Sequence, residues 1–172
     1  MSPALKKICE NTHTTNDFHR RLGLLQECLE EVLYHDDAHA DINSRITLGV
    51  AHAQKVGTSE DAQALEEWGV AVWSLFQIRN VVAVITKIKE EGELLPVLTL
   101  YIPVAFDTQG TKLVSVWCRE NINPQILLEL VVDSKVTGGC AFVLNDTYHD
   151  FSLRHAVEQN KGIVTQLLSS YV

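Results

Sequence analysis

The sequence predicts an α+β fold in which an N-terminal helical bundle (residues 1–92) is followed by a small α/β domain (93–172) with a short sheet and a C-terminal helix. Two observations predict this. Before Gly92, apolar residues recur at spacings of three and four, the period of an amphipathic helix. After Gly92, the apolar runs are rich in β-branched and aromatic residues and lose that period. A chain of 172 residues, 46% of them hydrophobic, is long enough to build two small cores.

Four segments of the first domain have helical character, and four or five helices are expected in all. The clearest is 17–34, where Asn16 can cap the first turn. Others are expected over 41–56 and 59–76. The segment 79–91 is β-branched but keeps helical spacing, so a helix is predicted there too. The inner face of the first of these helices is predicted to hold Phe18, Leu22, Leu25, Leu29, Val32 and Leu33.

The second domain is predicted to mix strands and helices. The expected elements are a strand over 98–106, a helix over 108–121, strands over 126–132 and 139–144, and a helix over 153–171. Pro103 makes the first strand an edge strand or introduces a bulge, and Asn145-Asp146 makes the turn after the third strand. The last helix is expected to turn Leu153, Ala156, Val157, Ile163 and Leu167 inward, with Gly162 weakening its middle.

Charge and cysteine usage exclude several classes of function. A net charge of -8 argues against a nucleic-acid binder, which needs clustered lysines and arginines. The four cysteines include no C-x-x-C pair and therefore no zinc-binding spacing. The N-terminus lacks a signal or transit pattern, and no apolar run is long enough to span a bilayer. A soluble protein with reduced thiols is expected, with any membrane association through partners.

One cluster could carry metal chemistry. In His35-Asp36-Asp37-Ala38-His39, the two histidines are four residues apart and would share one face of a helix. Asp36 would then follow the first histidine as a general base does in zinc proteases, which favours a small metal-dependent hydrolase as the alternative function. The segment is polar throughout, however, and Asp41 can cap the next helix. A solvated connector between two helices is the structural alternative.

The remaining candidates each have a structural interpretation beside the functional one. Cys140 could be a nucleophile at a bend but is expected to pack in the core. Gly138-Gly139 is followed by a strand and by no Lys-Ser or Lys-Thr, so it is a bend and not a phosphate loop. After His149, Asp150 or Ser152 is expected to cap the last helix. The isolated histidines, expected on the surface, are His13, His19, His52 and His155.

The third helix of the bundle carries more large apolar residues than one inner face needs. They are Trp68, Val72, Trp73 and Phe76. Core packing is the first interpretation. The second is a groove that accepts an amphipathic helix of another chain.

The second domain resembles a known family through one motif. An apolar strand (126–132) leads into Asp133-Ser134-Lys135-Val136-Thr137-Gly138-Gly139, a second strand follows, and Asp150-Phe151-Ser152-Leu153 precedes the closing helix. This layout resembles the δ subunit of bacterial F-type ATP synthases, the counterpart of the mitochondrial oligomycin-sensitivity-conferring protein. The matching positions are Asp133, Val136, Gly138, Gly139, Asp150, Ser152 and Leu153. Residues 73–85 are similar to a late segment of the family's helical domain, whereas 1–70 carry no matching motif.

The resemblance implies a mechanical role without catalysis, metal or cofactor. A δ subunit is a peripheral-stalk (stator) subunit on the cytoplasmic face of the inner membrane, to which it is bound only through the complex. Its helical domain holds the amphipathic N-terminal helices of α subunits, and its second domain holds the C-terminal end of subunit b. It thereby resists rotor torque during proton-driven ATP synthesis. An adaptor subunit of another rotary ATPase is a further possibility. The residues expected to line the α-binding groove are Leu22, Leu25, Leu29, Val72 and Phe76.

Overall fold

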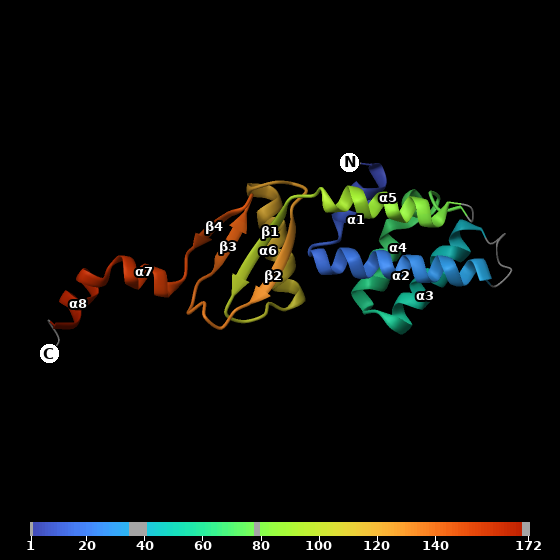
Figure 1. Ribbon diagram of the computed structural model, residues 1–172. Coiled ribbons are helices and arrows are strands. Elements are labelled where there is room, and N and C mark those ends of the chain that lie inside the picture. Colours follow the sequence, from blue (N-terminus) through green and yellow to red (C-terminus); the bar gives the residue numbers. More distant parts are fainter. Residues whose placement is uncertain (1, 35–40, 78–79, 170–172) are drawn as a thin grey trace. The chain divides into compact units, whose positions relative to one another are not determined.

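A computed structural model describes residues 2–34, 41–77 and 80–169 (Figure 1). The chain divides into two compact units, Met1–Leu95 and Pro96–Val172. Helices form the first unit, and a four-stranded mixed sheet with helices forms the second, so the predicted α+β class is confirmed. In the described ranges, no helix is both long and apolar enough to cross a membrane.

The helical unit is built from amphipathic helices, several of which have first turns capped by side chains. Its elements in the described chain are α1 (Pro3–Glu10), α2 (Thr15–Tyr34), α3 (Ile42–Val56), α4 (Ser59–Trp73) and α5 (Val81–Glu93). The Ser2 side chain accepts a hydrogen bond from Leu5 N, and Thr58 and Asp61 form a reciprocal capping box at α4. The sequence predicted a helix and not a strand for the β-branched segment 79–91, and helix α5 confirms a helix there.

The core of the helical unit is organised around two tryptophans of α4. Trp68 and Trp73 are fully buried, and each indole N–H has a partner. Trp68 donates to the side chain of Asn11 at 3.0 Å, and Trp73 donates to the Leu65 carbonyl at 3.0 Å. Gly49 of α3 packs so closely on the Trp73 ring that a Cβ at that position would overlap it. The tryptophans therefore fix the spacing of α3 and α4.

The second unit is a sheet with one helix across a face. Its elements are β1 (Val97–Ile102), α6 (Thr108–Asn121), β2 (Leu127–Val132), β3 (Ala141–Leu144), β4 (Thr147–Asp150), α7 (Leu153–Gln159) and α8 (Lys161–Ser169). The strand order is β2-β1-β3-β4. Strands β1 and β2 are parallel and joined by α6, whereas β3 pairs antiparallel with both of its neighbours. Consecutive parallel strands need a crossover connection, and α6 provides it between β1 and β2.

Burial in β1 alternates along the strand, as expected for a sheet with one covered face. The cluster at the centre joins the sheet to α6 and consists of Leu98, Cys118, Ile126 and Leu128, with Val114, Leu130, Phe142 and Leu144 packed against it. Figure 1 shows α6 on one face of the sheet and no helix drawn across the other. The uncovered face carries Tyr101 and Tyr148, whose rings meet edge to face with centroids 6.4 Å apart.

The structure corrects several sequence predictions. Helix α1 was not predicted, although Ser2 and Pro3 are a typical helix start. The first strand ends at Ile102, before Pro103, and β4 was missed because its four residues carry no apolar alternation. The predicted single helix over 153–171 is two helices separated at Asn160. Its predicted inward residues are exposed where described: Leu153, Ala156, Val157 and Ile163.

Candidate functional site

The five residues predicted to line a partner groove lie in the core of the helical unit. Their exposed fractions run from 0% to 3%. Their apolar character is therefore accounted for by packing within the unit, and none of them presents a surface to a second chain in this structure. The residues are Leu22, Leu25, Leu29, Val72 and Phe76.

The family-motif residues of the second unit come together in one hydrogen-bonded joint. The Gly-Gly joint, as we call it, consists of residues 133–139 and 150–153. Gly138 O accepts a hydrogen bond from Leu153 N at 3.0 Å. Both glycines have positive φ, 70° at Gly138 and 75° at Gly139. A Cβ at Gly139 would overlap the Phe151 carbonyl, so the two chain segments approach closely only because this residue is glycine.

Three polar side chains complete the Gly-Gly joint. Asp133 Oδ1 accepts from Lys135 N at 2.9 Å and so forms the turn that precedes the glycines. Asp150 Oδ1 accepts from Ser152 N at 2.8 Å. Hydrogen bonds from Ser152 lower the pKa of Asp150. Ser152 Oγ in turn accepts from His155 N at 3.2 Å and caps α7. Of the two predicted caps of the last helix, Ser152 accepts the capping hydrogen bond, and Asp150 supports Ser152.

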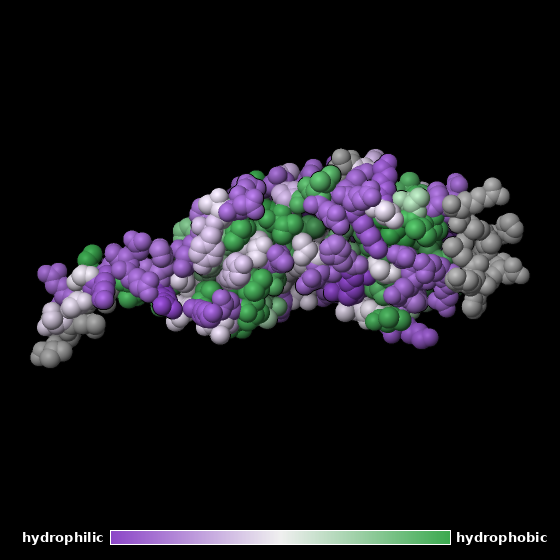
Figure 2. Space-filling model, in the orientation of Figure 1, coloured by the Kyte–Doolittle hydropathy of each residue, from purple (hydrophilic) through white to green (hydrophobic). Residues whose placement is uncertain are grey.

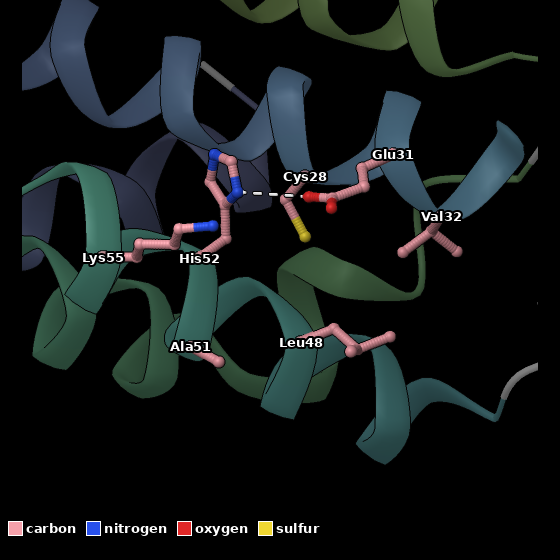
Figure 3. Close-up of a pocket in the computed structure, with 7 residues that line it drawn as sticks. All are labelled: Cys28, Glu31, Val32, Leu48, Ala51, His52 and Lys55. Atoms are coloured by element: carbon pink, nitrogen blue, oxygen red, sulfur yellow. Dashed lines mark ion pairs between the residues drawn. The ribbon is translucent and has the colours of Figure 1, made fainter. Parts of the chain in front are cut away.

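A pocket of about 250 Å³ lies between α2 and α3 (Figure 3). It is lined by Cys28, Glu31, Val32, Leu48, Ala51, His52 and Lys55. His52 of α3 lies between two carboxylates of α2. Its Nδ1 is 3.3 Å from Glu31 and its Nε2 is 3.4 Å from Glu27. The interpretation of His52 as a partnerless surface residue is therefore wrong, because its partners come from another helix.

The chemistry of the α2–α3 pocket favours binding over nucleophilic catalysis. Burial, with a smaller contribution from the Glu31 carboxylate, raises the pKa of the Cys28 thiol to about 11. The thiol is therefore protonated near neutral pH, and a protonated thiol is a poor nucleophile. Apolar walls from Val32 and Leu48 beside the charged Glu31 and Lys55 fit an amphipathic segment.

A larger pocket of about 710 Å³ lies between β1 and α6 in the second unit. Its lining is Leu98, Leu100, Ile102, Pro103, Val104, Ala105, Phe106, Val114, Trp117, Cys118, Ile122, Gly139, Cys140 and Phe142. No charged residue is among them. Burial raises the pKa of Cys118, which keeps that thiol protonated. Cys140, predicted to be a core residue, is only partly buried and lines this pocket.

In the described ranges, no group of three or more histidine, cysteine, aspartate or glutamate side chains could hold a metal ion. The predicted cluster of His35, Asp36 and His39 lies outside those ranges. Neither a protein-family model nor a curated protein matches the sequence. The resemblance carried by Asp133, the two glycines, Asp150 and Ser152 therefore stays a prediction.

Proposed function

We propose that this protein is a non-catalytic stator subunit of an F-type ATP synthase that links the α/β hexamer to subunit b. The observation that carries the proposal is the Gly-Gly joint. Residues from Asp133 to Leu153, which carry the resemblance to the δ subunit, act together in one structural device that fixes where the final helices begin. Their spacing thus has a common physical reason, which a chance match over separate positions would lack.

The α2–α3 pocket is our candidate site for an N-terminal helix of an α subunit. It replaces the buried residues of the sequence prediction, because four of its lining residues are exposed: Glu31, Leu48, Ala51 and Lys55. Leu48 contributes an exposed apolar side chain, and Lys55 and Glu31 flank the apolar walls. An amphipathic helix could bury its apolar stripe against Val32 and Leu48 and leave its polar face in water.

The sheet face that α6 does not cover is our candidate site for the C-terminal end of subunit b. Tyr101 and Tyr148 form its aromatic centre, and Val131 and Val143 lie beside them in the strand register. Figure 2 shows apolar surface among polar residues over these strands. Tyrosines suit such a contact because they bury large area and keep a polar hydroxyl. Binding at both units would let the subunit transmit the resisting torque while it remains peripheral on the cytoplasmic face of the membrane.

The α-subunit contact can be tested by titrating the full chain with a peptide of the α N-terminal helix from the same genome. Calorimetry would measure the affinity of the wild type, Leu48→Glu and Val56→Glu. Leu48 lines the pocket, whereas Val56 is exposed on the same helix outside it. We expect Leu48→Glu to weaken binding at least about tenfold and Val56→Glu to leave it unchanged. Equal affinity for all three chains, or no binding by the wild type, would contradict this site.

A further inference from the structure

We infer that the protein self-associates by exchanging its C-terminal helices. The tail, defined as residues 153–169 with α7 and α8, would seat in the β1–α6 pocket of a second copy. The tail of the second copy would seat in the pocket of the first. The inference does not rest on the proposed function, because it uses only the pocket, the tail and the joint between them.

The pocket is an apolar surface that lacks a cover. At its mouth, Trp117 is 58% exposed, and Phe106 and Val104 are exposed as well. No charged side chain lines it. An apolar cavity of about 710 Å³ open to water is typical of a surface that receives a ligand or another chain.

Three apolar side chains of the tail that the structure describes are exposed: Leu153, Val157 and Ile163. Helix α7 buries none of its residues. Leu153 and Val157 are one helical turn apart and therefore share one face, and both are exposed. Ile163 of α8 is 59% exposed. A pair of short helices with this much exposed apolar surface gains stability when another surface covers it.

The Gly-Gly joint prevents the tail from covering the pocket of its own chain. Gly139 lines that pocket, and Leu153 N is bonded to Gly138 O, so the tail begins at the pocket's edge. Helix α7 follows at once and leads away from its anchor by about 1.5 Å per residue. Only Asn160 separates α7 from α8, whereas a reversal between helices takes about two to eight residues.

Charge favours the tail of this chain, rather than an acidic segment, as the occupant. The tail carries two cations, Arg154 and Lys161, against one carboxylate, Glu158. Residues 96–152, which contain the pocket, carry six carboxylates against three lysines and arginines. Tail and pocket-bearing body thus have opposite net charge, which promotes their association. Because each copy has one tail and one pocket, a two-fold exchange satisfies both and closes the assembly.

The test is sedimentation velocity of the full chain over a range of concentrations. The variants are Ile163→Lys in the tail, Trp117→Lys at the pocket mouth, and the control Leu113→Lys. Leu113 is 65% exposed on α6 but does not line the pocket. All three side chains are exposed, so circular dichroism should show the same folded state for each variant.

We expect the wild type to convert from monomer to dimer as concentration rises. Ile163→Lys and Trp117→Lys should each weaken dimerisation at least about tenfold, and Leu113→Lys should not change it. A mixture of the first two variants should associate more tightly than either alone, since it can form one intact tail–pocket contact. A wild type that is monomeric throughout, an equal effect of Leu113→Lys, or no recovery in the mixture would overturn the inference.

Discussion

Arg21 and Asp61 form a buried ion pair that joins α2 to α4, with Arg21 Nε 3.0 Å from Asp61 Oδ1. Asp61 also accepts two hydrogen bonds from Arg20 and is the capping partner of Thr58. Arg21 donates in addition to the Asn11 carbonyl. Every side-chain polar atom of this network that is buried in the described structure has a hydrogen-bond partner. The network therefore holds three segments of the helical unit together through one carboxylate.

Replacing this carboxylate should destabilise the helical unit. Asp61→Asn leaves the buried Arg21 without a charged partner, and we expect a loss of about 3 kcal/mol in the free energy of unfolding. The control is Asp17→Asn, which removes only an exposed pair with Arg20 and should cost less than about 1 kcal/mol. Urea denaturation measures both. Equal losses in the two variants would contradict the role of Asp61.

The same carboxylate should make stability depend on pH in acid. Burial raises the pKa of Asp61, but the hydrogen bonds from Arg20, Arg21 and Thr58 outweigh burial and hold the pKa well below its ordinary value. Its contribution is therefore complete above the unfolded value of about 4 and is lost as the pH falls below it. The stability difference between wild type and Asp61→Asn should shrink as the pH falls below about 4. A difference that grows in acid would reverse the sign of this linkage.

Alanine should destabilise the Gly-Gly joint by different amounts at its two glycines. Both have positive φ, so alanine costs about 1 kcal/mol at either position. At Gly139 the new Cβ also overlaps the Phe151 carbonyl, whereas at Gly138 it would lie at an ordinary distance of 3.6 Å from Leu153 Cβ. Gly139→Ala should therefore lower the melting temperature of the second unit much more than Gly138→Ala. The reverse order would mean that the close approach at Phe151 is not what fixes the joint.

Two helical glycines of the first unit should respond to alanine with opposite signs. A Cβ at Gly49 overlaps the Trp73 ring, and overpacking of this kind costs about 1–3 kcal/mol. At Gly23 of α2 an added Cβ would meet no heavy atom within 4 Å beyond its own helix backbone, so alanine should stabilise the helix by about 0.5–1 kcal/mol. Thermal unfolding would measure the melting temperatures of Gly49→Ala and Gly23→Ala against the wild type. A destabilised Gly23→Ala would show that this position packs more tightly than the structure has it.

The regular elements could be predicted wherever local sequence determines them. Helix α6 begins and ends at the predicted residues, and Asp107 caps its first turn. The parallel pair β1 and β2 follows from two apolar runs on either side of that helix. The turn at Asn145-Asp146 was predicted, and both residues have the positive φ of a tight hairpin.

What the sequence could not predict depends on contacts between distant segments. The partners of His52 are on α2, and its own helix gives no sign of them. The ion pairs of Asp61 could not be predicted either, because Arg20 and Arg21 come from another helix. The apolar pattern of the tail predicts a face that needs cover, but it cannot predict which chain provides the cover.

The central claim is that this protein joins a rotary ATP synthase through partners on both units. The most direct test is a pull-down of the tagged full chain from detergent-solubilised native membranes, with the co-purifying chains identified by mass. We predict stoichiometric α, β and b subunits, and no loss of any of them for the control Val56→Glu. Recovery of the protein without these subunits would contradict the stator account, and a bound transition metal in that sample would instead favour a metal-dependent role for His35 and His39.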